Sequence, residues 1–183
     1  MNIKNIFEKS ADFTIKRIIE IFGIILIIFS ILLLLSFASY SPEDPNFIFN
    51  SEKEIENILG FRGSYTSDIF FQSFGIISYL IPVTLIFTGI YIFRSKKIFI
   101  LLRNLFYTIL YIILGSFFFS FFYKETFWLT INGNGGFVGS YLNNSFLHDF
   151  TKINQMLAYY FLVIIILLIF LISINFKLKF LPK

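Results

Sequence analysis

The chain has 183 residues, of which 57% are apolar, 14% are charged and none is cysteine, and its net charge is +4. This composition excludes an ordinary soluble domain, a disulfide framework and a thiolate metal site, and it indicates an integral membrane protein. The basic residues are not clustered in one soluble segment, so the positive charge does not indicate a nucleic-acid surface.

The first apolar segment follows a cationic flank. Residues 1–17 form this flank, either as a short amphipathic helix on the membrane surface or as a disordered segment. The segment from Ile21 to Ala38 carries no charge, and about 20 apolar residues cross a bilayer, so we predict span one at residues 18–38. A cleaved signal peptide is the alternative, because Ser36-Phe37-Ala38 has small-x-small spacing, but the apolar run exceeds the usual length of about 7 to 15 residues.

A proline turn ends this span. Pro42 and Pro45 remove backbone donors and disfavour helix before them, and the polar residues around them are turn formers. The turn opens an acidic loop at residues 39–68, which we expect to be external. Within the loop, the segment from Ser51 to Glu54 has capping-box spacing, which predicts a short surface helix that stops at Gly60.

Span two is predicted at residues 69–93, with Ser64 or Ser67 as its N-cap. Its apolar stretch is longer than a straight span requires, so we expect a tilt, a break near Gly75 or a kink at Pro82.

A basic connection at residues 94–103 leads to span three at residues 104–123. In this span Gly115, Ser116 and Ser120 are small enough to allow close helix contact, but such pairs are frequent by chance and ordinary packing is the simpler interpretation.

The second external loop is predicted at residues 124–152. Its segment from Asn132 to Gly136 contains three glycines and favours a turn with positive φ. Apolar residues between Val138 and Phe150 recur at helical spacing, which predicts a helix lying on the bilayer or against the other external segment. Span four is predicted at residues 153–176, and residues 177–183 form a basic tail.

The basic residues also predict the orientation. Eleven lie in the N-terminal flank, the 94–103 connection and the tail, against four in the other two loops. By the positive-inside rule, both termini and the 94–103 connection face the cytoplasm. We therefore expect an all-α integral membrane protein, a four-helix transmembrane bundle with small external helices and turns.

No motif for chemistry is visible. The sequence contains no Walker A, HExxH or GxSxG pattern, and the centres of the spans lack ionisable residues. We therefore predict no catalytic, cofactor-binding or metal-binding residue, and we expect the protein not to be an enzyme.

Two other classes of function remain as alternatives. A small transporter or channel requires a polar path, so Gln72, Ser116, Ser120 and Asn175 would have to converge. A lipid-modifying enzyme requires interfacial acid–base groups, and Asp68 with Glu43 or His148 is the available set.

The order and spacing of several short blocks resemble the N-terminal four-span membrane domain of the FtsK/SpoIIIE DNA translocases. The blocks are Ser39 to Phe47, Asn57-Ile58-Leu59-Gly60 with Gly63, Asp68 with Phe70 to Gly75, Ser78 to Pro82, and Gly135 to Gly139 with Leu142. The resemblance implies a membrane anchor for a chromosome-segregation motor at the division septum of the bacterial inner membrane. It also implies homo-oligomers and contacts with other membrane proteins of the divisome.

In that family the membrane domain continues into a linker, an ATPase and a DNA-reading winged helix. The present sequence ends just after span four, so we expect either a fragment of a translocase or a stand-alone membrane piece. Neither form is expected to contact nucleic acid directly through this segment, and the bilayer is its principal partner.

Three sets of residues are candidates for functional roles. The external interaction turn contains Tyr40, Ser41, Pro42, Asp44, Pro45 and Asn46. The external glycine loop contains Gly135, Gly136 and Gly139, and the residues expected to shape span two are Asp68, Gly75 and Pro82. We expect the turn and the glycine loop to pack together into one small cap.

Overall fold

A computed structural model describes residues 3–45, 54–124, 129 and 131–176, and this part of the chain contains helices and no strands. The helices are α1 (Ile3–Ala38), α2 (Gly60–Phe74), the 3-10 helix η1 (Gly75–Tyr79), α3 (Leu80–Ser95), α4 (Phe99–Phe122), α5 (Gly136–Asn143), α6 (Phe146–Ile153) and α7 (Gln155–Ser173). Four helical segments are long and apolar enough to cross a membrane, namely Glu8–Ala38, Gly60–Ser95, Phe99–Phe122 and Gln155–Ser173. The predicted all-α, four-span fold is confirmed.

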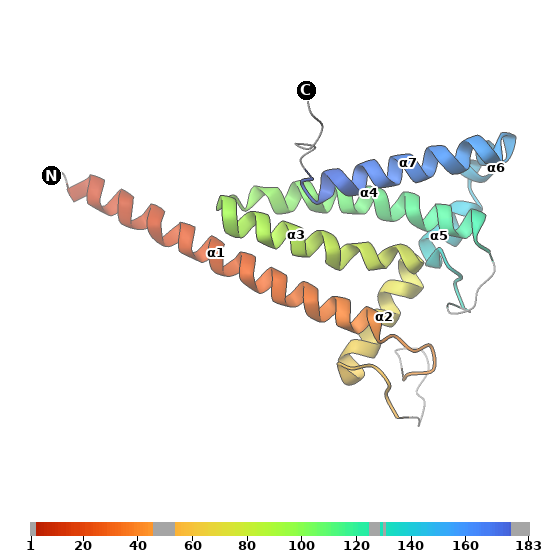
Figure 1. Ribbon diagram of the computed structural model, residues 1–183, viewed down its shortest axis with the longest axis horizontal. Helices are drawn as coiled ribbons and strands as arrows, with labels where there is room; N and C mark the ends of the chain where they lie inside the picture. Colours follow the sequence, from red (N-terminus) through yellow and green to blue (C-terminus); the bar gives the residue numbers. More distant parts are fainter. Residues whose placement is uncertain (1–2, 46–53, 125–128, 130, 177–183) are drawn as a thin grey trace.

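The long helices form a row in chain order. Helix α1 packs along α3, α3 packs against α4, and α4 packs along α7, so that α1 and α7 form opposite flanks (Figure 1). The short helices α2, η1, α5 and α6 gather at one end of the row, and we call residues 39–45, 54–79, 129 and 131–154 the cap. We call the opposite end, with the α3–α4 connection, the basic end.

Helix α1 is longer than expected. The N-terminal flank does not form a separate surface helix, because the first glycine of the chain is Gly23 and no proline interrupts the segment before it. Ion pairs at helical spacing, Asp12 with Lys16 and Arg17 with Glu20, stabilise this extension.

The prediction of a surface helix that ends at Gly60 is wrong. Residues 54–59 are not helical, residues 51–53 lie outside the described part, and Gly60 with φ 63° is the first residue of α2. Ser64 and Ser67, the predicted N-caps of span two, both lie inside α2 and are buried.

The predicted break in span two is confirmed at Gly75. This residue has φ 74°, and it separates α2 from η1. Pro82, the alternative kink, is the third residue of α3. Backbone amides in the first turn of a helix need no partner within the helix, so proline is tolerated at this position without a kink.

The helix predicted between Val138 and Phe150 is divided in two. Ser145 adopts an extended conformation, and its hydroxyl accepts a hydrogen bond from the amide of Leu147, which caps the N-terminus of α6. The chain therefore changes direction between α5 and α6 before α7 begins.

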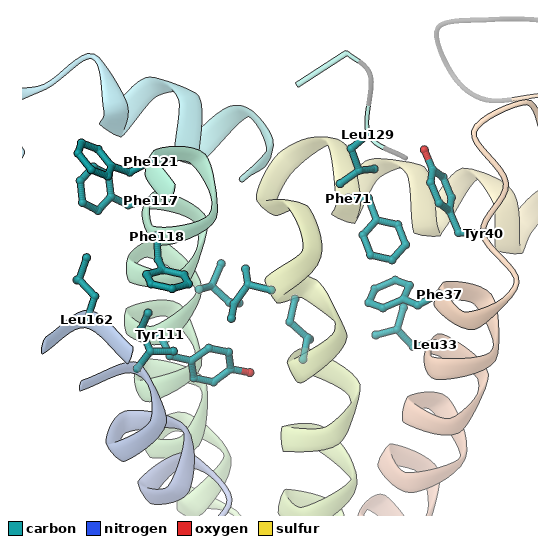
Figure 2. Packing of buried hydrophobic residues seen from close by; sticks show 14 residues of the cluster. Leu33, Phe37, Tyr40, Phe71, Tyr111, Phe117, Phe118, Phe121, Leu129 and Leu162 are labelled. Carbon is teal, nitrogen blue, oxygen red and sulfur yellow. The ribbon is translucent and has the colours of Figure 1, made fainter. Parts of the chain in front are cut away.

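The buried core is rich in aromatic rings and extends from the spans into the cap (Figure 2). Phe37 near the end of α1 lies with its ring centroid 5.1 Å from that of Phe71 of α2, and Tyr40 lies 4.8 Å from Phe71. Leu129 from the second loop packs beside these rings. The cap is therefore continuous with the hydrophobic core of the spans.

Candidate functional site

The proline turn is held from inside by Asp44. Its side chain is 4% exposed, and its two carboxylate oxygens accept hydrogen bonds from the amides of Glu56 at 2.8 Å and Asn57 at 3.0 Å. The carbonyl of Pro45 accepts a hydrogen bond from the hydroxyl of Ser64 in α2. The acidic residue of the turn therefore fixes the loop to itself rather than facing a partner.

Asn57 joins the end of α1 to the start of α2. Its side-chain amide donates to the carbonyls of Ser36 at 2.9 Å and Ser39 at 3.1 Å, and its side-chain oxygen accepts from the amide of Leu59 at 3.1 Å. One buried side chain thus satisfies carbonyls at the end of one helix and an amide before the next. A Cβ at Gly63 would lie 2.0 Å from this side-chain oxygen, so the arrangement requires glycine there.

A chain of polar side chains connects the turn to the second loop through α2. The Tyr40 hydroxyl donates to Oδ1 of Asp68 at 3.3 Å, and the Gln72 side-chain amide donates to the same oxygen at 3.3 Å. Asn132 of the glycine loop then donates to the side-chain oxygen of Gln72 at 3.0 Å. Burial, together with the nearby Asp68 carboxylate, raises the pKa of Tyr40, so its hydroxyl remains a donor.

The proline turn and the glycine loop, which we expected to pack together, are joined by this chain of side chains through α2. Both belong to the cap, and α2 lies between them, because Asp68 and Gln72 contact the turn on one side and the glycine loop on the other.

The glycine loop packs by direct backbone contact. Cβ atoms placed at Gly135 or Gly139 would lie 2.3 Å from the carbonyl oxygen of Ser116 in α4. A Cβ at Gly136, where φ is 64°, would lie 2.6 Å from the amide nitrogen of Gly75. These glycines therefore allow the loop to touch α4 at Ser116 and the break in span two at Gly75.

The glycine loop, α4 and η1 together satisfy the backbone at the break. The amide of Ile76 donates to the carbonyl of Asn134 at 3.0 Å, and the carbonyl of Phe74 accepts from the Ser116 hydroxyl at 2.8 Å. The carbonyl of Phe70 accepts from the Ser78 hydroxyl at 3.0 Å. Such partners satisfy the backbone groups that an interrupted helix leaves without intrahelical hydrogen bonds.

Only part of the predicted interaction turn is accessible. Tyr40, Asp44 and Pro45 are buried, Ser41 is half-buried, Pro42 is exposed, and Asn46 lies outside the described residues. Further residues of this loop and of the start of α2 are exposed, and sequence reasoning did not identify them as candidates. We define the loop patch as Pro42, Glu43, Ile55, Ile58 and Phe61, in which Ile58 is 70% exposed and Phe61 is 52% exposed.

The residues considered for a transport path do not form one. Gln72 belongs to the cap, and Ser116 and Ser120 contact the cap from α4, whereas Asn175 follows the far end of α7.

A buried polar cluster that the sequence analysis missed joins three spans. Thr84 of α3 lies within hydrogen-bond distance of Tyr111 of α4 at 3.0 Å and of Ser173 of α7 at 3.2 Å. One turn further along α3, Thr88 accepts a hydrogen bond from Asn104 of α4 at 2.9 Å. The spacing of the two threonines, four residues apart, was the signal in the sequence that could have indicated this cluster. Hydrogen bonds between uncharged polar side chains of this kind hold membrane helices together.

The set considered for a lipid-modifying enzyme is divided. Asp68 is 4% exposed and its Oδ1 is occupied by Tyr40 and Gln72, so the carboxyl group is not presented to a substrate. His148 lies on α6, where Nδ1 is 2.8 Å from the Asn143 side-chain oxygen.

Comparison with known proteins adds to this geometry. The family described as the 4TM region of DNA translocase FtsK/SpoIIIE matches residues 15–180. The chain is also 28% identical over 151 residues to the DNA translocase FtsK of Rickettsia bellii (strain RML369-C). That match covers 79% of this chain and 19% of the relative, so the chain spans about a fifth of the relative's length. No solved structure matches the chain.

Proposed function

Because the chain belongs to the family of the 4TM region of DNA translocase FtsK/SpoIIIE, we propose that it anchors such a translocase in the bacterial inner membrane. The match from residue 15 to residue 180 carries this proposal, since it includes most of the first candidate span, all of the other three and the cap. The chain acts as an anchor and interaction domain rather than as a catalyst. Its two termini and the basic end face the cytoplasm, in agreement with the distribution of Lys and Arg.

We further propose that this domain supports cell division and chromosome partition at the septum by contacting membrane proteins of the divisome and further copies of itself. The loop patch is the surface that favours such contacts. Ile58 and Phe61 expose apolar side chains, and the amides of Glu56 and Asn57 bind Asp44, which holds this segment against the turn that follows α1. Exposed apolar residues rimmed by charge are typical of interaction sites.

The test is the position of a fluorescent fusion of residues 1–183 in dividing bacterial cells. We expect the parent to accumulate at midcell and the variant I58S/F61S to spread evenly over the membrane. The matched control is F137S/Y141S, which removes two exposed rings from α5 and is expected to remain at midcell. Asp44 and Pro45 are unsuitable for this test, because both are buried and their substitution would disturb the cap.

Two results would contradict these proposals. Even membrane fluorescence of the parent would show that the domain does not recognise the septum. Equal loss of midcell signal in both double variants would show that recognition does not depend on the loop patch.

A further inference from the structure

An open groove of about 440 Å³ lies at the basic end between α1 and the α3–α4 connection. The N-terminal turns of α1 project beyond this connection (Figure 1). Ile19 of α1 lines one side of the groove. The opposite wall is the connection with the first turns of α4. The residues that line the groove are Ile19, Lys96, Lys97, Ile98, Phe99, Ile100 and Arg103, which combine an apolar surface with three cations.

The positive charge of the groove is only partly neutralised. Glu20 of α1 binds Lys96 with an N–O distance of 2.9 Å, and the same carboxylate also pairs with Arg17. Within the described part of the chain, Lys97 and Arg103 have no carboxylate in ion-pair contact. The side-chain contact of Arg103 is a long one, 3.4 Å to the oxygen of Asn104. The groove therefore offers two cations to an anionic ligand.

The position and the lining of the groove identify the kind of anion. It lies where α3 ends and α4 begins, both within membrane-crossing segments, and Phe99 beside the cations is 79% exposed. A phospholipid carries a phosphate group next to hydrocarbon, and the groove has cations next to apolar side chains. Basic pockets between membrane helices are known to bind such headgroups. Nucleic acid offers phosphate without hydrocarbon, and it would leave Ile19 and Phe99 uncovered.

We propose that this groove binds an anionic phospholipid. Its phosphate group contacts Lys97 and Arg103, and the part of the acyl chain nearest the headgroup packs against Ile19 and Phe99. The lipid then fills the space between α1 and the α3–α4 connection at the basic end. The proposal does not rest on septal recognition, and it is measured on the purified protein, so the two proposals can fail separately.

The test measures lipid retention by the purified chain of residues 1–183. The protein is reconstituted in phosphatidylcholine vesicles containing phosphatidylglycerol, extracted in mild detergent and examined by native mass spectrometry. We expect the parent to retain phosphatidylglycerol in preference to phosphatidylcholine. In K97Q/R103Q the affinity for phosphatidylglycerol is expected to fall about tenfold or more, because each of the two cations contributes to the binding free energy of an anionic lipid.

Two further variants separate a defined site from general charge. K124Q/K152Q removes the same charge from exposed positions of the loop and the cap and is expected to bind like the parent. Ile19→Trp keeps every charge and fills the groove, so it is expected to lose phosphatidylglycerol as K97Q/R103Q does. Circular dichroism would reveal whether the loss of two cations disturbs folding. If it does, Ile19→Trp still tests whether the groove is the lipid site.

Three results would overturn the proposal. The first is unchanged binding of phosphatidylglycerol by K97Q/R103Q or by Ile19→Trp. The second is an equal loss of binding in K124Q/K152Q. The third is displacement of the lipid by a short DNA duplex that binds more tightly, which would assign the groove to nucleic acid.

Discussion

At the scale of single residues, the cap depends on buried polar side chains that satisfy backbone groups. Asn57 and Asp44 have this role, and neither is available to a partner. When a buried carbonyl loses its hydrogen-bond donor, the free energy of unfolding falls by about 1 to 3 kcal/mol, which is a large fraction of the stability of a domain.

We therefore predict that Asn57→Ala lowers the free energy of unfolding by about 2 kcal/mol, because it leaves the carbonyls of Ser36 and Ser39 without a donor. The measurement is unfolding of the purified protein in mixed detergent micelles, followed by circular dichroism. Asn144→Ala is the control, since Asn144 is exposed and is expected to contribute little. Equal stability of the two variants would show that the hydrogen bonds of Asn57 do not hold the cap.

At the scale of elements, the interruption between α2 and α3 is held by contacts from elsewhere in the chain. The glycine loop approaches Gly75 so closely that a Cβ there would lie 1.9 Å from the carbonyl oxygen of Asn134. Gly60 at the start of α2 has a similar positive φ, but a Cβ there would have no neighbour within 4 Å. Gly75 also has ψ −154°, which together with its positive φ is a conformation essentially confined to glycine, so it differs from Gly60 in backbone conformation as well as in packing.

We predict that Gly60→Ala destabilises the protein by about 1 kcal/mol, because alanine is disfavoured at positive φ. Gly75→Ala is expected to cost at least about 2 kcal/mol more, since the loop must also move away from the break. Both values come from the same unfolding measurement in micelles. If the two variants were equally stable, the glycine loop would not pack against the break as tightly as described.

At the scale of the whole molecule, the row has two chemically different ends. The cap lies at one end, and Arg94, Lys96, Lys97 and Arg103 lie at the other. The chain has no cysteine, so single cysteines can report which end faces which side of the membrane.

We predict that a membrane-impermeant maleimide labels Asn144→Cys in cells whose outer membrane is permeabilised. Lys97→Cys is expected to react only after the inner membrane is opened, because the positive-inside rule places the basic end in the cytoplasm. The reverse pattern would contradict the proposed orientation.

The spans could be predicted because an apolar run must be long enough to cross the hydrocarbon core. An irregularity in span two could be predicted because its apolar stretch is too long, but the sequence did not decide between a tilt, a break at Gly75 and a kink at Pro82. The start of α2 could not, because it depends on Asn57, whose partners Ser36 and Ser39 are distant in the sequence. The capping pattern at Ser51 is a local signal, and it did not predict the course of residues 54–59.

The candidate site was predicted less completely than the fold. Residue types indicated that the turn and the glycine loop are special, but they did not distinguish buried residues from exposed ones. Asp44 is a polar turn former in sequence, whereas in the fold it is buried against the backbone of its own loop. Exposure depends on which elements meet, and Ile58 became a candidate only when its neighbours were known.

The continuity of α1 has a mechanical consequence. Its 36 residues form an uninterrupted rod about 54 Å long, which exceeds the thickness of a hydrocarbon core of about 30 Å. Near its end, the Ser36 hydroxyl donates to the carbonyl of Gly63, so the rod is joined directly to α2. Span two, by contrast, is divided at Gly75, and contacts from the glycine loop and α4 hold the break. A load applied to the first turns of α1 would therefore pass along one continuous helix to its far end, and from there directly into α2 and the cap.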